Sequence, residues 1–491
     1  MNYIEGTSRD QIFLFNECID EIIGEDNLVR FIDAYVEALD MEGLGFNMPK
    51  GNTGTPPYRP QMKLKIYIYG YFEKIRSSRR LEKECHRNKE LIWLTNGLTP
   101  DFKTIADFRK ENHKAFRNIF KEFLKLCHKL QLISFKVVAI DGTKLRGQNS
   151  LNEVYKEDTI KKVEKEIEEQ INHYLKKLDE MDKNEQTGKF SINQEKIQEI
   201  NKRLNKLMRR KDKIEYIEEI FVQDPSLKTY FATDNDSRLQ SDKGKVRPGY
   251  NPQTGVEEKN KLIVVADVTN EQNDKRQLSP MVMQIKGIKE ELKIEEKTDA
   301  IADSGYYSEK EIINNNGDNF TVIVSPEAEN KKESLKKYQA EDFNYNRERD
   351  VYICPEGNEL KKTNRDVFLD KNEREVNAYN CKANTCNCCP SKEYCTDGKH
   401  GRKLLLSANK EIMQTYIENL KTEKNKNLIS KRKELAEHPF GTIKRTFGYT
   451  YFLLKGIDKV KAEFSFICFI YNLKRVLNIV SINELITVLN G

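Results

Sequence analysis

Short apolar runs bounded by turn residues mark the middle of the chain. They are residues 135–140, 261–268, 300–302 and 320–324. Runs of this length are typical of buried strands, and helix-length stretches separate several of them. We therefore predict a mixed sheet with helices, interrupted by two insertions. The segment 248–252 (PGYNP) predicts a turn before the second of these strands.

Helical spacing of apolar residues dominates the chain to about residue 130. Met62, Ile66 and Tyr69 recur at intervals of three and four, as on one face of a helix. Short helices that are joined by turns and rich in arginine are typical of a helix-turn-helix-like DNA reader. The candidate DNA contacts are Arg79, Arg80, Arg109 and Lys110. The alternative is a core helical bundle with a basic outer face.

The first insertion, residues 155–220, is rich in Lys, Glu, Ile and Leu. It carries two apolar stripes at helical spacing: Ile160, Val163, Ile167, Ile171, Leu175 and Leu178, then Ile197, Ile200, Leu204, Leu207 and Ile214. The polar residues 184–188 lie between them, so we predict an antiparallel helical hairpin with coiled-coil character. It is either a solvated arm that packs only on itself or an arm for dimerisation or DNA clamping.

The second insertion, residues 326–430, contains six of the ten cysteines. We predict disulfides to be rare in a cytosolic chain, and a Cys-x-x-Cys pair with two further thiolates supplies a tetrahedral zinc site. The predicted structural zinc ligands are Cys354, Cys386, Cys389 and Cys395, and Cys381 or Cys388 could replace one of them. An unoccupied or redox-labile cluster is the alternative.

Three acids stand where a catalytic metal site could form. Asp141 and Asp303 each follow an apolar run and precede a glycine turn, and Glu437 lies in a basic segment. Hard divalent cations prefer carboxylate oxygens, and two-metal phosphoryl transfer uses several of them. Pro439 predicts that a helix begins just after Glu437. The rival acids Asp267 and Asp274 are predicted to be structural or solvated.

Composition fits a protein of several parts, with 491 residues, 37% hydrophobic and 33% charged residues. The net charge of +6 favours nucleic acid only weakly. Residues 101–150 and 401–450 each carry 11 Lys or Arg against 5 acids, so positive charge is concentrated near the first and third acids. No apolar run is long enough to cross a bilayer and the N-terminus does not resemble a signal peptide, so we expect a cytoplasmic protein without membrane contact.

Several of these segments resemble the DDE transposases of bacterial insertion sequences, in particular the eleven-eighty-two family, which is related to the insertion-sequence-four and -five groups. The resembling segments are YRPQMKLKIYIYGYFEKIRSSRRLEKECHRN (58–88), VVAIDGTKLRG (137–147), GYNPQTGVEEKNKLIVVADVTNEQND (249–274), IADSGYYS (301–308) and EHPFGTIKR (437–445). The resemblance implies an α/β fold with an RNase H-like catalytic core. It also implies a bacterial, nucleoid-associated protein.

Carried over residue by residue, the resemblance implies that Asp141, Asp303 and Glu437 are the catalytic carboxylates that bind Mg²⁺ or Mn²⁺. The family signature runs Tyr, two residues, Arg, three residues, Glu, six residues, Lys. Glu437 and Lys444 match it, but Ser430 replaces Tyr and Lys433 replaces Arg. A lysine lacks the bidentate fork of arginine, which affects the auxiliary DNA contacts. The predicted phosphate-binding residues are Lys444, Lys433, Lys144 and Arg146.

The predicted domains are residues 1–130, a helical DNA-binding domain; 131–154, 221–325 and 431–491, the catalytic core; 155–220, the hairpin; and 326–430, the Cys-rich insertion. The implied function is binding to the terminal inverted repeats of an element in double-stranded DNA, cleavage there, and strand transfer to target DNA, with a homodimer acting on the DNA. The alternatives are a metal-dependent nuclease without strand transfer and a DNA-binding repressor remnant.

Overall fold

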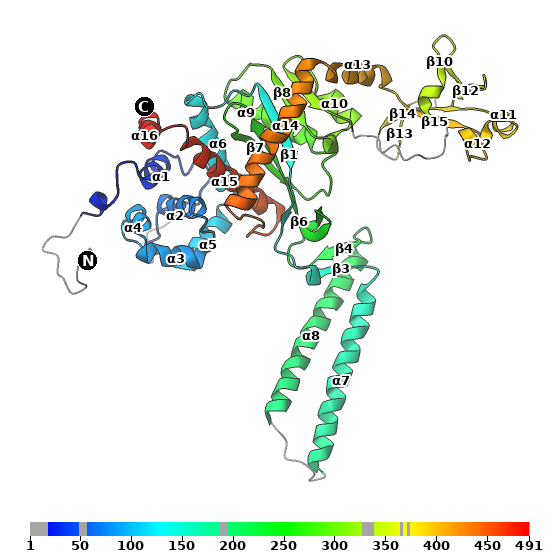
Figure 1. Ribbon diagram of the computed structural model, residues 1–491. Helices are drawn as coiled ribbons and strands as arrows, with labels where there is room; N and C mark the ends of the chain where they lie inside the picture. The colour runs from blue at the N-terminus through cyan, green and yellow to red at the C-terminus, as the bar shows by residue number, and fades with distance from the viewer. Residues whose placement is uncertain are drawn as a thin grey trace, which may run out of the picture.

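The computed structural model describes residues 18–48, 56–186, 194–326, 338–363, 367–370 and 374–490. A body contains the central sheet, and a long two-helix arm and a small strand-rich unit project from it (Figure 1). None of the helices in these residues is long and apolar enough to span a membrane.

The central sheet has seven strands, and five of them form its main layer: β1 (Val137–Gly142), β6 (Lys245–Glu257), β7 (Ile263–Thr269), β8 (Thr298–Ala302) and β9 (Phe320–Val324). Their spatial order is β7-β6-β1-β8-β9. Strands β1, β8 and β9 are parallel, whereas β6 is antiparallel to both β1 and β7. The predicted mixed sheet with flanking helices is therefore confirmed.

Strand β6 corrects the predicted turn at residues 248–252. These residues lie inside a continuous strand, which also pairs with the short strands β2 (Leu145–Arg146) and β5 (Arg238–Asp242). Position 249 requires glycine because β2 packs closely against it, and not because the chain turns there. A Cβ at Gly249 would lie 2.2 Å from the carbonyl oxygen of Leu145. Pro248 and Pro252 offer their carbonyls to the amides of Gly147 and Thr143, at 3.1 and 2.8 Å.

Different helices cover the two faces of the sheet. On one face, Val137, Ala139 and Ile301 pack with Leu435 and Ala436 of α14 (Glu423–Gly441), which follows α13 (Lys410–Leu420). The alternate strand residues face the larger core, on which α9 (Leu278–Glu291), α10 (Glu309–Asn315) and α15 (Ile457–Val476) pack. The last helix, α16 (Ile482–Asn490), packs on α1 and α6 instead. Alternate residues of a strand point to opposite faces, so β1 and β8 are buried on both sides.

The N-terminal part is helical, as predicted, over its described residues. Its helices are α1 (Leu28–Glu37), α2 (Pro60–Phe72), α3 (Ser78–Arg87), α4 (Lys89–Leu94), α5 (Phe102–Glu111) and α6 (His113–Lys129). They do not form a separate core, because α6 packs along α15 and one hydrophobic cluster runs from Ile23 to Leu485. The predicted boundary at residue 130 is therefore a change of secondary structure within one packed body.

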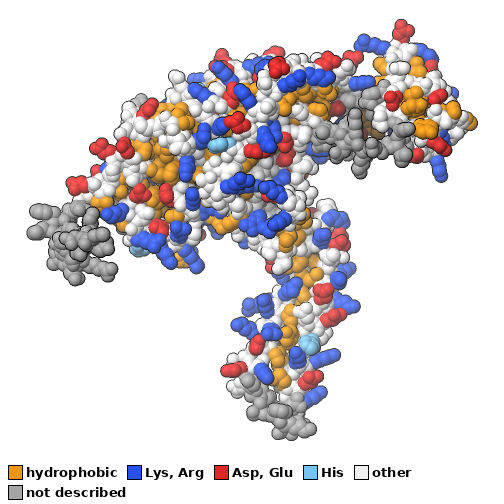
Figure 2. All heavy atoms as spheres, in the orientation of Figure 1, with side chains coloured by type: hydrophobic (Ala, Val, Ile, Leu, Met, Phe, Trp, Pro, Cys, Tyr) orange, Lys and Arg blue, Asp and Glu red, His pale blue; other side chains and the backbone are white. Residues whose placement is uncertain are grey.

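The predicted hairpin is present as α7 (Ile160–Gln186) and α8 (Gln194–Gln223). Ile160, Ile167, Ile214, Ile217 and Phe221 form its buried seam, next to the pair of strands β3 (Val154–Lys156) and β4 (Thr229–Phe231) at its root. The connection at residues 187–193, which includes part of the predicted polar link, lies outside the described residues. The arm projects away from the body with its apolar seam between the two helices (Figures 1 and 2).

The Cys-rich segment forms its own small antiparallel sheet. Its strands are β10 (Asn344–Asn346), β11 (Val351–Ile353), β12 (Glu359–Lys362), β13 (Phe368–Leu369), β14 (Glu375–Asn380) and β15 (Lys403–Ser407). Two short helices, α11 (Ala383–Asn387) and α12 (Lys392–Cys395), connect β14 to β15. We call the described residues between 338 and 407 the cysteine unit.

A buried ion pair ties the N-terminal helices to α15. The Glu463 carboxylate accepts the amide protons of Leu453 and Leu454, and it lies 3.5 Å from the guanidinium of Arg76. Arg76 is also held between the rings of Tyr449 and Tyr451. Both charges are removed from water, so each depends on the other.

Glu463→Ala is expected to destabilise the protein by about 3–5 kcal/mol, because it leaves the buried Arg76 guanidinium without its counter-charge and two amides without their acceptor. The free energy of unfolding in urea measures this. The exposed Glu25→Ala is the control, and it should change the free energy by less than about 0.5 kcal/mol. A Glu463→Ala protein as stable as the wild type would refute the importance of this tie.

Candidate active site

Parallel pairing of β1 with β8 brings two of the predicted acids together. Val137 pairs with Asp299 and Ala139 with Ile301, so continuing the register by two residues places Asp141 beside Asp303. Each acid lies two residues after a strand residue that packs against α14: Asp141 follows Ala139, and Asp303 follows Ile301. Side chains two apart on a strand point to the same face, so both carboxylates lie on the α14 side at the carboxyl edge of the sheet.

Each carboxylate accepts a hydrogen bond from a backbone amide one or two residues further along the chain. Asp141 Oδ1 accepts the amide proton of Gly142 at 2.9 Å. Asp303 Oδ1 accepts that of Gly305 at 2.9 Å and so caps the 3-10 helix Ser304–Tyr306. The Asp-Gly and Asp-Ser-Gly sequences therefore fix the orientation of both acids.

The environment of Asp141 disfavours its charged form. Burial is the main cause, and with the nearby charge of Asp303 it raises the pKa of the Asp141 carboxyl to about 7. The Gly142 amide and Arg432 of α14 act in the opposite direction. A buried carboxyl group whose pKa is raised in this way is a common feature of functional sites.

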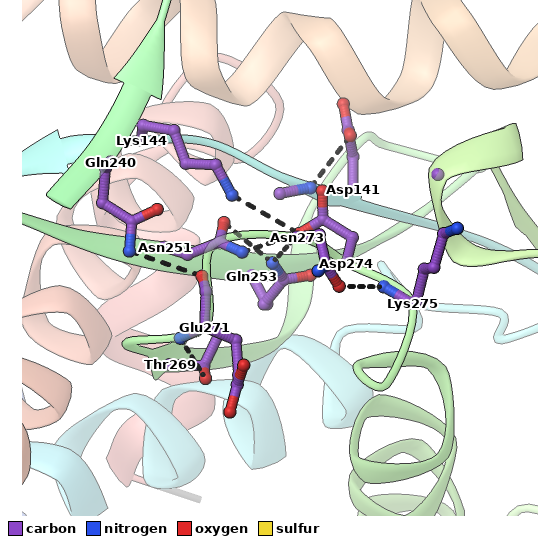
Figure 3. Close-up of polar contacts among 12 residues, drawn as sticks. Asp141, Lys144, Gln240, Asn251, Gln253, Thr269, Glu271, Asn273, Asp274 and Lys275 are labelled. Carbon is purple, nitrogen blue, oxygen red and sulfur yellow. Dashed lines mark hydrogen bonds and ion pairs between the residues drawn. The ribbon is translucent and has the colours of Figure 1, made fainter. Parts of the chain in front are cut away.

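A polar cluster lies beneath Gly142, on the other side of the strand. The carboxylate of Asp274 accepts from the amides of Asn251 and Gln253 at 2.7 and 2.9 Å, and Tyr306 donates to the Gln253 oxygen. A Cβ at Gly142 would lie 2.4 Å from the Gln253 amide nitrogen. Glycine is therefore the residue that fits after Asp141. Figure 3 shows Asp274 among these amides, while Asp141 points away toward the helix above it.

The rival acids thus have structural partners. Asp274 is held by the two amides and lies 3.8 Å from Lys144. Asp267 accepts from Gln284 at 2.9 Å and pairs with Lys461 at 2.9 Å. Both placements agree with the structural role predicted for them.

Basic side chains line a cleft next to the acid pair. A hollow of about 300 Å³ is bordered by Lys144, Arg146, Lys245, Arg247 and Lys444. Burial lowers the pKa of the Lys444 and Lys144 ammonium groups, although Asp141 lies close enough to both to oppose this. Lys and Arg side chains also gather on the body near the root of the arm (Figure 2). Five cations and one acid, Asp242, border the cleft, so its charge suits a phosphate backbone.

Two of these cations were not among the phosphate-binding residues predicted from the sequence. Lys245 and Arg247 lie at the start of β6, in the segment whose continuation was predicted to be a turn. Their position depends on the pairing of β6 with β5 and β2, which local composition does not reveal. A second hollow, bordered by Arg146, Arg247 and Tyr451, extends the basic surface toward the arm.

Glu437 is not brought to the other two acids. It is exposed on α14 and borders an open surface with Ser430, Lys433, Glu434 and His438. Within the described residues, no group of three or more Asp, Glu, His or Cys is placed to hold a metal ion.

The predicted helix start at Pro439 is wrong. Helix α14 continues through Pro439 to Gly441 and passes directly into a π-helical turn, Thr442–Thr446. Pro439 is buried inside α14, where it cannot donate the backbone hydrogen bond that a helix would otherwise make to the carbonyl of Leu435. Glu437 therefore lies near the C-terminal end of a long helix.

The predicted N-terminal contacts fall into two groups. Arg79 and Arg80 on α3 and Lys110 on α5 are exposed. Arg109 is instead used internally, because it donates to the Tyr71 hydroxyl at 2.8 Å and lies over the Tyr67 ring. Its placement supports packing against α15 rather than DNA contact.

Two family models match the chain. Residues 353–477 match a "Transposase DDE domain" and residues 17–111 match a "Transposase domain (DUF772)". No curated protein matches the sequence. The first match covers most of the cysteine unit and all of α13, α14 and α15, and the second covers most of the N-terminal helices. Together they indicate a transposase and support the DDE class, a class of DNA-processing enzymes.

Asp141→Asn is expected to stabilise the metal-free protein at pH 8 by on the order of 2 kcal/mol, allowing for solvent screening. The raised pKa means that the folded state binds a proton more tightly than the unfolded state, so wild-type stability falls as pH rises from about 4 to 7. Unfolding in a chelator between pH 5 and 8 measures this. A stability difference between the two proteins that does not grow with pH would contradict the burial of this carboxylate.

Proposed function

We propose that this protein is a DDE transposase that binds the terminal inverted repeats of its element, cuts the DNA there and joins the freed 3′ end to target DNA. The observation that carries the proposal is the pairing of Asp141 with Asp303 beside a basic cleft, in a chain that matches two transposase family models. The strand order β7-β6-β1-β8-β9, with helices on both faces, supports an RNase H-like core.

The acid pair suits Mg²⁺ or Mn²⁺. Carboxylate oxygens are the ligands that these ions prefer, and a cation would offset the cost of burying two negative charges side by side. When bound, such an ion supplies positive charge that stabilises the charge developing on phosphate oxygens. Asp141 and Asp303 would hold it.

Glu437 is proposed as the third carboxylate, on the strength of its position in the segment that resembles the family signature. Its exposed orientation means that the end of α14 must turn for it to join the pair. Pro439 and the π-helical turn Thr442–Thr446 already interrupt regular helical hydrogen bonding at this point. We therefore propose that the end of α14 rotates at this point, where fewer regular helical hydrogen bonds oppose the movement.

The cleft residues hold the DNA backbone in this proposal. Lys144, Lys245 and Lys444 act as point charges, and Arg146 and Arg247 offer planar forks to phosphate oxygens. Lys433 is proposed to contact phosphate along α14. Arg79, Arg80 and Lys110, which are exposed on the N-terminal helices, are proposed to contact the repeat DNA.

Joining two element ends requires two active sites, so a homodimer on DNA is part of the proposal. The separation of Glu437 from the acid pair is the observation that favours an alternative, a DNA-binding repressor remnant. A metal-dependent nuclease that cuts without joining is the other alternative. The assay below separates all three.

Asp303→Asn is expected to lower cleavage and joining by at least about a thousandfold while leaving DNA binding intact, because it removes a charge that the metal requires. Cleavage and strand transfer are measured on DNA carrying the element's ends with Mg²⁺ or Mn²⁺. The exposed Asp318→Asn is the matched control and should keep full activity. Wild-type binding without chemistry would identify a remnant, and cutting without joining a nuclease. Full activity in Asp303→Asn would overturn the site.

Arg247→Ala is expected to weaken DNA binding about tenfold, and to reduce the slope of log affinity against log salt by about one, because one phosphate contact is lost. Titrations of end DNA between low and moderate salt measure both. Arg347→Ala removes an exposed arginine of the cysteine unit and serves as control, with 82% of its side chain accessible. Equal effects of the two substitutions would exclude the cleft as the DNA path.

A further inference from the structure

Five cysteines of the cysteine unit border one small pocket. They are Cys354, Cys381, Cys386, Cys389 and Cys395. They come from three separate places: the end of β11, the end of β14 with the helix that follows, and α12. Cys388, next to one of them, is exposed and does not border the pocket. The fold therefore gathers thiols that are up to 41 residues apart in sequence, from 354 to 395.

The backbone around two of these thiols forms turns that point amide protons at sulfur. The amide of Asn358 donates to Cys354 Sγ at 3.3 Å, in a turn closed by a bond from Gly357 to the Cys354 carbonyl. The amide of Arg402 donates to Cys386 Sγ at 3.3 Å. Such bonds stabilise a sulfur that carries negative charge, so they favour thiolates that bind a metal.

Glycines make both turns possible. Gly357 has φ of +76° and Gly401 has φ of +87°, a backbone region that favours glycine. A Cβ at Gly401 would also lie 2.7 Å from the Cys381 carbonyl oxygen. The chain is thus shaped to bring the loop before β15 close to the cysteines.

The hydrophobic core of this unit is small. Among the described residues it has eight buried members, and three of them are cysteines. A sheet of this size rarely holds its shape by apolar burial alone and usually needs a covalent or metal crosslink. All ten cysteines have free thiols here.

The geometry points to a structural zinc site formed by Cys354, Cys386, Cys389 and Cys395. Cys386 and Cys389 form the Cys-x-x-Cys pair, with the Cys389 amide donating to the Cys386 carbonyl at 3.2 Å. Four thiolates are a complete tetrahedral set for Zn²⁺, and four protons leave to solvent as it binds. No three of the side chains already stand in a metal-binding arrangement, so closure requires the thiols to turn about χ1.

Cys395 is chosen over Cys381 as the fourth ligand because of where the two lie in the fold. Cys395 ends α12 and reaches the pocket from an element of its own, whereas Cys381 follows β14 just before the helix that carries Cys386. Arg402 also joins Cys395 to the pair: its guanidinium donates to the Cys395 carbonyl at 2.8 Å, and its amide donates to Cys386 Sγ at 3.3 Å.

Zinc content of the full-length protein, purified with reductant and without added chelator, tests the site. One zinc per chain is expected by elemental analysis and by native mass spectrometry. Cys386→Ser and Cys395→Ser should lower zinc content at least about tenfold, whereas Cys388→Ser and Cys381→Ser should retain it. Zinc content does not depend on DNA cleavage, so failure of the zinc site and failure of the proposed function can be told apart.

If a serine variant fails to fold, thiol titration of the wild-type protein decides the question. Four thiols that become reactive only after a strong chelator is added support the site. A wild-type protein that neither contains nor takes up zinc would overturn it, as would a mass lower by two hydrogens, which would show a disulfide. Loss of zinc in Cys381→Ser with retention in Cys395→Ser would overturn the choice of ligand.

Discussion

The parallel pairing of β1 with β8 is the contact on which the candidate site depends. These strands lie far apart in sequence, separated by the arm and by β6 and β7, and their register sets Asp141 beside Asp303. Apolar residues on both faces of each strand fix that register, because a slip by one residue would turn every buried side chain to the wrong face. The site is thus a consequence of core packing at the end of two strands.

Placing two carboxylates side by side in a partly buried position costs free energy, and the surrounding structure shows how the cost is limited. Backbone amides at Gly142 and Gly305 each donate to one acid. Arg432, Lys144 and Lys444 bring positive charge near Asp141. Beneath the strand, Asn251 and Gln253 hold Asp274 against the backbone of Gly142. Two of these cations, Lys144 and Lys444, also line the cleft proposed for DNA.

The sequence predicted the parts of the fold that rest on local pattern. Apolar runs identified β1, β7, β8 and β9, because strands buried on both faces need nothing but apolar residues. Strand β6 was missed because its prolines and Gly249 are typical of turns, and only its neighbours explain them. The cations Lys245 and Arg247 were missed with it. The internal role of Arg109 and the path of α14 through Pro439 depend on packing against α15 and on a π-helical turn, which no local pattern shows.

The central claim is that Asp141 and Asp303 act on the same metal ion. Calorimetric titration of Mn²⁺ into the wild type, Asp141→Asn, Asp303→Asn and the double variant tests it directly. The account predicts that each single substitution weakens binding and that the double variant binds no more weakly than the weaker single variant, since one shared site is already lost. Binding that is unchanged in either single variant, or losses that add in the double variant, would contradict a shared site.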